Sequence, residues 1–122
     1  MRAVFALLLL CAFIFAEAQT ISRGPYLNVG TPNSMIVRWR TDVAVKGKVL
    51  YGTDLNNIVT PATETSSKTE HIVTITGLDA GTKYYYTITD ANDNSYQGAD
   101  SLRYFQTSPV PGTRQPITIW AL

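Results

Sequence analysis

The stretch Gly77-Leu-Asp-Ala-Gly-Thr-Lys-Tyr-Tyr-Tyr86 decides the fold class of this chain. Its glycines permit a tight turn, and Leu78 can bury its side chain in the core where the chain leaves one sheet. Tyr84 lies at the start of an alternating strand. A tyrosine in that place can bury its ring and hydrogen-bond its hydroxyl to a backbone group of the preceding corner. Such a tyrosine corner is typical of two antiparallel sheets packed face to face.

An earlier strand carries the matching core residue. Met35, Val37 and Trp39 recur at every second position, so they share one face of a strand. An indole that faced outward could instead serve as a ligand platform, but the shared period with Met35 and Val37 favours packing. We therefore predict that Trp39, Leu78 and Tyr84 belong to the structural core.

The chain between Ile21 and Thr107 is a series of short alternating segments rich in Val, Ile, Thr and Tyr, which Gly, Pro, Asn and Asp separate. No stretch has a helical period, so we predict an all-β domain, a two-sheet antiparallel sandwich of about seven strands. The expected strands are Arg23–Leu27, Met35–Thr41, Lys48–Gly52, His71–Thr76, Lys83–Thr89 and Leu102–Thr107, with a weaker one at Asn57–Thr60.

Residues 1–18 have the pattern of a signal peptide. Arg2 supplies a positive start, residues 3–15 are apolar, and Ala16-Glu-Ala18 is an A-x-A cleavage site that leaves Gln19 as the mature N-terminus. A membrane anchor is the alternative, although the apolar run is short for a bilayer. We expect a secreted or periplasmic protein that has no membrane contact once the signal is removed.

Composition limits the partners of the mature chain. Cys11 lies within the apolar run and is the only cysteine, so no disulfide is expected and the core alone must stabilise the domain. The net charge is +1 with or without residues 1–18, because Arg2 and Glu17 cancel, and the positive residues are spread along the strands. Since a nucleic-acid module needs clustered Lys and Arg, we expect no nucleic-acid partner.

The sequence changes character after residue 108. Residues 109–115 are rich in proline and glycine and are expected to form a linker, which makes residues 19–108 one domain. Residues 116–122 read as an apolar strand that ends before any turn. We expect this strand to be the first element of a second, truncated domain. The alternative is a complete chain whose last strand folds back, which would leave an exposed apolar edge.

Few side chains in this segment suit catalysis or metal binding. His71 is the only histidine, and its place in an alternating strand favours a half-buried packing or hydrogen-bonding role over metal ligation. Asp90-Ala-Asn-Asp-Asn-Ser95 spaces oxygen ligands like the start of a calcium loop, but Ser95 stands where Gly is needed, and turn chemistry explains the same residues. Nucleophile elbows and phosphate-binding glycine loops are absent from the sequence. We expect no catalytic residue, no metal-binding residue and no cofactor in this segment.

The tyrosines suggest one further reading, an aromatic platform for a sugar. Alternation sends Tyr84 and Tyr86 inward, so we expect Tyr85 alone on the outer face. A platform needs at least two exposed coplanar rings, and the sequence around Tyr85 and Tyr96 shows no such pair.

Two resemblances rest on these residues. Trp39 and the Leu78-x-x-Gly-Thr-x-Tyr84 corner make the domain similar to a fibronectin type III domain, a pattern that is informative about fold and silent about function. The chain more closely resembles the N-terminal domain of purple acid phosphatases and their relatives in the metallophosphoesterase group. The segments that carry this resemblance are Arg23–Leu27, Val37–Asp42, Val49–Thr53, His71–Leu78, Thr82–Tyr86, Phe105–Pro109 and Ile119–Leu122.

The resemblance implies a parent protein with a second domain. In that family a catalytic domain follows, which hydrolyses phosphomonoesters with two metal ions, iron with iron, zinc or manganese. Its first metal ligand is the Asp of a Gly-Asp pair directly after a strand like Ile119–Leu122, so no ligand is carried onto this segment. We expect a noncatalytic domain whose partner is its own catalytic domain, with a phosphate ester as the substrate of the parent. The alternative is a stand-alone adhesion or spacer module of an exported surface protein or polysaccharide-degrading enzyme.

Overall fold

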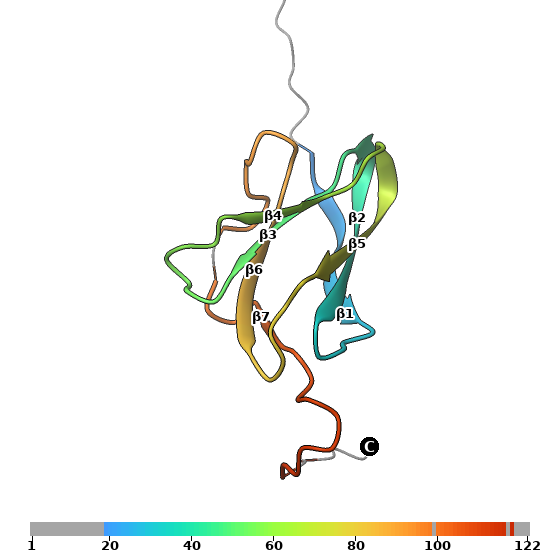
Figure 1. Cartoon of the computed structure of the whole chain (residues 1–122). Helices are drawn as coiled ribbons and strands as arrows, with labels where there is room; N and C mark the ends of the chain where they lie inside the picture. Colours follow the sequence, from blue (N-terminus) through green and yellow to red (C-terminus); the bar gives the residue numbers. More distant parts are fainter. Residues whose placement is uncertain (1–18, 99, 117, 119–122) are drawn as a thin grey trace, which may run out of the picture.

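The computed structural model describes residues 19–98, 100–116 and 118. Within these residues, seven strands form two antiparallel sheets and no helix is present (Figure 1). The strands are β1 (Ile21–Asn28), β2 (Ser34–Val45), β3 (Lys48–Gly52), β4 (Thr60–Thr63), β5 (Lys68–Thr76), β6 (Lys83–Thr89) and β7 (Tyr104–Gln106). The predicted all-β class and strand number are confirmed.

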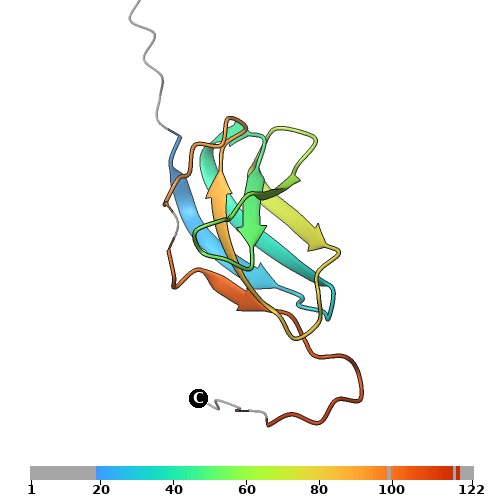
Figure 2. The ribbon, with the colours of Figure 1, turned by 60° about the vertical axis from the view of Figure 1, so that its left-hand side comes forward.

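The two sheets face each other. One has the strand order β1-β2-β5 and the other the order β4-β3-β6-β7. Figure 2 shows that the segment after β7 leaves the sandwich at the end opposite to the one where β1 begins. We call the end where it leaves the linker end, after the predicted linker at 109–115; it contains the β1–β2 loop and the β5–β6 connection. We call the opposite end the closed end; it contains the β2–β3 and β4–β5 turns.

The core follows from the alternation of the strands. On β2, Met35, Val37 and Trp39 are buried, and the residues between them are less so. On β6, Tyr84 and Tyr86 are buried, as their period predicts. The other buried hydrophobic residues are Val49, Val73, Ile75, Leu78, Ile88 and Phe105.

One predicted strand is wrong. Asn57 lies in a turn, where its N–H donates to the Asp54 carbonyl oxygen at 3.0 Å, and β4 begins only at Thr60. Only one residue of β4 is even partly buried, so the strand has no apolar alternation to detect. Pro61 is accommodated because β4 is an edge strand and needs ladder partners on one side only.

Other boundaries move by a few residues. β1 begins at Ile21, β5 begins at Lys68, and β7 is confined to Tyr104–Gln106. The predicted signal peptide at 1–18 lies outside the described residues, and the predicted strand at 116–122 lies largely outside them, so both stay predictions. No helix that could cross a bilayer is found in the described part of the chain.

Candidate functional site

The linker end contains the predicted tyrosine corner. The backbone N–H of Asp79 donates to the Tyr84 hydroxyl oxygen at 3.0 Å, and the Tyr84 ring stacks on the Phe105 ring with 5.6 Å between centroids. Leu78 is buried as well, and its N–H donates to the Asn33 carbonyl oxygen at 3.0 Å. The corner therefore ties the β5–β6 connection to the β1–β2 loop.

The closed end contains a buried polar network centred on His71. The His71 ring stacks on the Trp39 ring with 4.6 Å between centroids, and both residues are 1% exposed. His71 Nδ1 lies 2.7 Å from Glu64 Oε2, and His71 Nε2 lies 2.9 Å from Thr41 Oγ1. Because Glu64 directly follows β4 and His71 belongs to β5, the network joins the two sheets.

The hydrogen bonds around His71 have definite partners on both sides of the ring. The Thr41 hydroxyl lies 2.7 Å from the Val43 carbonyl oxygen, which can only accept, so the hydroxyl donates there. Its single proton is then used, and His71 Nε2 must donate to Thr41 Oγ1. His71 Nδ1 donates to the Glu64 carboxylate. Both ring nitrogens are therefore occupied by hydrogen-bond partners inside the sandwich.

Glu64 accepts hydrogen bonds from several sides. Its Oε1 accepts the Ile72 N–H at 3.1 Å, its Oε2 accepts the Gly47 N–H at 3.2 Å, and Lys68 Nζ lies 3.5 Å from Oε1. Burial acts to raise the pKa of Glu64, but the hydrogen bonds from His71 and from the backbone outweigh it and hold this pKa below its ordinary value. Glu64 is therefore ionised at neutral pH.

Gly47 leaves room for this pair. A Cβ at this position would lie 2.6 Å from His71 Nδ1, 2.6 Å from the Trp39 ring and 2.7 Å from Glu64 Oε2. These distances are well inside van der Waals contact, so any side chain here would displace the pair. The β2–β3 turn closes over the network because the residue at its end is a glycine.

A hydroxyl, an imidazole and a carboxylate in this order are the groups of a nucleophilic triad, yet here they are structural. Thr41 and His71 are each 1% exposed, so no substrate reaches the hydroxyl. The hydrogen-bonding role predicted for His71 is confirmed, although the residue is fully buried rather than half-buried. Glu64 was missed, because no sequence signal links it to a histidine seven residues away across a turn.

The loop after β6 is organised by its own side chains. Asp90 accepts hydrogen bonds from the N–H groups of Asn92 and Asn94 and from the Asn94 side chain, at 2.8–2.9 Å. Asp93 has a φ of +66° and pairs with Lys48. These contacts are turn chemistry. Among the described residues, no group of three or more His, Cys, Asp or Glu side chains is arranged to hold a metal ion.

The outer face of the four-stranded sheet carries an aromatic pair that the sequence did not predict. Tyr85 on β6 lies opposite Tyr104 on β7, with ring centroids 6.4 Å apart and planes inclined by 66°. Lys83 Nζ lies 3.9 Å from the Tyr104 centroid and 4.8 Å from the Tyr85 centroid. The expectation that Tyr85 stands alone is wrong, because β7 brings Tyr104 beside it. The rings are steeply inclined, so they form no flat sugar platform.

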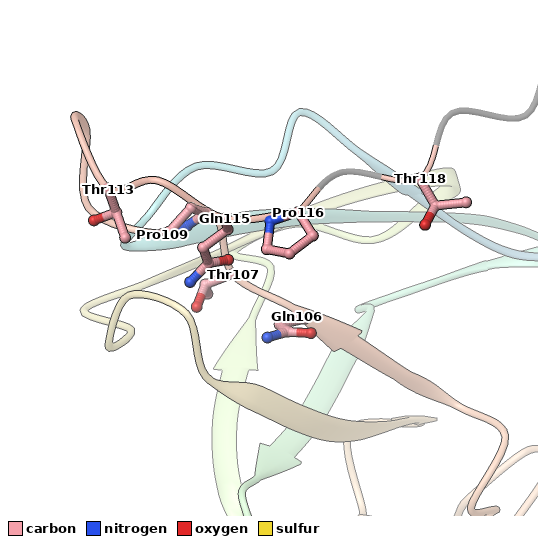
Figure 3. A pocket seen from close by; sticks show the side chains of 7 residues that line it. All are labelled: Gln106, Thr107, Pro109, Thr113, Gln115, Pro116 and Thr118. Atoms are coloured by element: carbon pink, nitrogen blue, oxygen red, sulfur yellow. The ribbon is translucent and has the colours of Figure 1, made fainter.

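An open hollow of about 430 Å³ lies between β7 and the linker. Figure 3 shows the side chains that line it, which are Gln106, Thr107, Pro109, Thr113, Gln115, Pro116 and Thr118. None of them ionises near neutral pH, so the hollow offers no general acid and no general base.

A family model described as the purple acid phosphatase N-terminal domain matches residues 23–107. The chain belongs to this family. The match runs from β1 to just past the end of β7 and stops before the predicted linker at 109–115, so it covers the sandwich and confirms the resemblance seen in the sequence.

One solved structure is similar to this chain. It is the sensor domain of the anti-sigma factor RsgI4 from Pseudobacteroides cellulosolvens, with 16% identity and a TM-score of 0.46, over 83% of this chain and 98% of that one. Because both values are low, nothing is transferred from that protein. No curated protein matches the chain.

Membership of the family implies metal ions in the catalytic domain of the parent protein. The described residues of this segment do not fit such a centre. A two-metal site needs several His, Asp and Asn ligands, whereas the one histidine is enclosed by Glu64, Thr41 and Trp39. No catalytic step is assigned to these residues.

Proposed function

We propose that this chain is the noncatalytic N-terminal domain of an exported purple acid phosphatase-like enzyme, which hydrolyses phosphomonoesters at a two-metal site in the domain after the linker. The observation that carries this proposal is the family match over residues 23–107. The expected metals are iron with iron, zinc or manganese, all bound outside this segment. Export depends on the leader at residues 1–18, and the partner of the domain is its own catalytic domain.

The polar groups of the described residues support the noncatalytic role. His71 and Glu64 satisfy each other inside the closed end, and Asp90 satisfies the backbone of its own loop. Groups that are used in this way are not available to bind a metal ion or to transfer a proton to a phosphate ester. The domain therefore contributes a rigid sandwich beside the catalytic domain.

The coding sequence immediately after Leu122 tests this proposal first. A Gly-Asp pair followed by further Asp, Asn-His and His motifs is the expected result. A stop codon or another fibronectin-like unit there would overturn the proposal in favour of an adhesion or spacer module.

Activity measurements then test whether catalysis resides only in the domain after the linker. The parent chain and the same chain cut after Leu122 are compared for hydrolysis of p-nitrophenyl phosphate and for bound transition metals. We expect activity and metal in the parent only. If residues 19–122 alone bound two metal ions and hydrolysed the ester, the noncatalytic assignment would be wrong.

A further inference from the structure

The linker end exposes a strained valine. Val29 is the first residue after β1 and has a φ of +45°. This left-handed region is unfavourable for L-residues, because Cβ comes too close to the carbonyl oxygen, and it is least tolerated by β-branched side chains. The Val29 side chain is 64% exposed, so burial within the domain does not offset the strain.

Hydrogen bonds hold the strained loop in place. The Thr31 N–H donates to the Ser34 carbonyl oxygen at 3.0 Å, and the Asn33 carbonyl oxygen accepts the Leu78 N–H at 3.0 Å. The Thr31 carbonyl oxygen accepts the Ser108 N–H at 3.2 Å, which places the loop against the start of the linker. Strain of this kind persists only where the surroundings impose it, and it concentrates at functional positions.

The surface around Val29 has the composition of a protein interface. Residues 27–37 and 104–113 contain no charged residue, the β5–β6 connection at 77–82 adds Asp79, and Lys83 and Arg114 follow these segments directly, so charge is sparse at this end. Val110 of the linker is 60% exposed. The centres of protein interfaces are depleted of charge, because desolvating an unpaired charge is costly.

Exposure alone does not distinguish Val29. Val59, in the β3–β4 loop, is 65% exposed, and single exposed apolar residues are ordinary. Val59 has no positive φ. Val29 differs from Val59 in three ways: it is strained, the segments around it carry few charges, and its loop is hydrogen-bonded to Ser108.

Leu27, near the end of β1, is 37% exposed. We propose that the linker end, formed by Leu27, Val29 and residues 108–110, is the surface on which the following domain of the same chain docks. The inference rests on the proposed function, because the occupant is the catalytic domain. The linker leaves the sandwich at this end (Figure 2), so a domain joined to it is held nearby at high effective concentration. Docking covers Val29 without burying an unpaired charge beside it. The β1–β2 loop is already held by hydrogen bonds, so it loses little conformational entropy on docking.

Cysteine labelling of the parent protein tests this surface. The variants Val29→Cys and Val59→Cys form a matched pair, since the two side chains are equally exposed in this domain and the mature segment has no other cysteine. The folded parent is treated with a maleimide, and the labelled peptides are quantified by mass spectrometry. We expect loss of labelling at position 29, full labelling at position 59, and recovery at position 29 after the linker is cut.

Each other outcome overturns a defined part of the inference. Equal labelling at both positions in an active parent phosphatase refutes the docking surface and leaves the proposed function intact. Protection at position 29 that vanishes on dilution, together with a dimer in analytical ultracentrifugation, makes a second copy the occupant and refutes the intramolecular docking. A parent without a phosphatase domain is recognised from its coding sequence before any labelling, and then the proposed function has failed.

A second pair of variants tests the same surface if Val29→Cys does not fold. Val29→Gly relieves the left-handed strain while removing the apolar side chain, and Val59→Gly is its control. In the parent protein we expect amide hydrogen exchange in residues 108–113 to rise in the Val29→Gly variant and to stay unchanged in the control. Unchanged exchange in both variants refutes the docking surface.

Discussion

The two ends of this sandwich differ in charge, burial and backbone strain. The closed end buries the hydrogen-bonded side chains of His71 and Glu64 and joins the two sheets through them. The linker end has almost no charge, exposes Val29 and holds it in a left-handed conformation. From this difference we expect substitutions at the closed end to cost more stability than those at the linker end, which is the docking surface in our proposal.

The energetics of the two ends follow from their chemistry. Removing one partner of a buried hydrogen bond to a charged group costs about 1.5–3 kcal/mol. The tyrosine corner is a neutral, partly buried hydrogen bond, whose net contribution is about 1 kcal/mol. Substitutions at the closed end should therefore lower the free energy of unfolding more than substitutions at the linker end.

The largest effect is expected for Trp39→Ala. Trp39 is buried and stacks on His71, so the substitution removes a large core side chain and one wall of the polar network. We expect the free energy of unfolding to fall by about 3–5 kcal/mol. Urea denaturation of the chain measures it, with Tyr104→Ala on the outer face as the control. A loss no larger than that of the control would remove Trp39 from the centre of the closed end.

Glu64→Gln should give the next largest loss. The substitution keeps the shape of the side chain but removes the charge that His71 and the backbone donors stabilise. We expect a loss of about 2–3 kcal/mol at neutral pH, the range for hydrogen bonds to charged groups. Glu70→Gln, which breaks the exposed pair with Arg40, is the matched control and should cost less than about 1 kcal/mol.

The pH dependence of Glu64→Gln sharpens the same comparison. The pKa of Glu64 is lower in the folded chain than its ordinary value, so the unfolded chain binds this proton more readily. The stability due to Glu64 is therefore complete above a pH of about 4.3, the ordinary glutamate pKa, and is lost as the pH falls through the folded-state value. Unfolding curves at decreasing pH should show the gap between wild type and variant closing. A gap that is constant with pH would exclude an ionised Glu64.

Tyr84→Phe should have a smaller effect. It removes the acceptor of the Asp79 N–H and leaves the ring in the core. We expect a loss of about 1–2 kcal/mol, because a partly buried donor is left without its partner. Tyr85→Phe, on the outer face of the same strand, is the control for the loss of a tyrosine hydroxyl. If Tyr84→Phe cost as much as Trp39→Ala, stability would not be concentrated at the closed end.

The smallest effect, and one of opposite sign, is expected for Val29→Gly. Relief of the left-handed strain should raise the free energy of unfolding by about 1–2 kcal/mol. The greater flexibility of glycine in the unfolded chain should lower it by about 0.5–1 kcal/mol. We expect a net gain of up to about 1.5 kcal/mol in the stability of the sandwich. Val59→Gly relieves no strain and should lose about 0.5–1 kcal/mol. Equal losses in thermal unfolding of both variants would mean that Val29 is not strained.

Prediction from the sequence succeeded where the signal is local. The buried faces of β2 and β6 follow from period-two alternation, and the corner joins Tyr84 to a residue only five positions earlier. It failed for β4, whose exposed residues have no period, and for the Tyr85–Tyr104 pair, which exists only because β7 lies beside β6. The polar network could not be predicted either, because it joins residues that are far apart in the sequence: Thr41 and His71 are separated by 30 residues.

The all-β class, the core residues of the long strands and the family of this chain can all be predicted from its residues, because alternation and turn residues act within a few positions. The enclosure of His71 with Glu64 and the strained conformation of Val29 become visible only in the folded chain. Both depend on groups from distant strands and loops that meet at one end of the sandwich. The burial that results sets the pKa of Glu64, and the hydrogen bonds that result set the conformation of the loop at Val29.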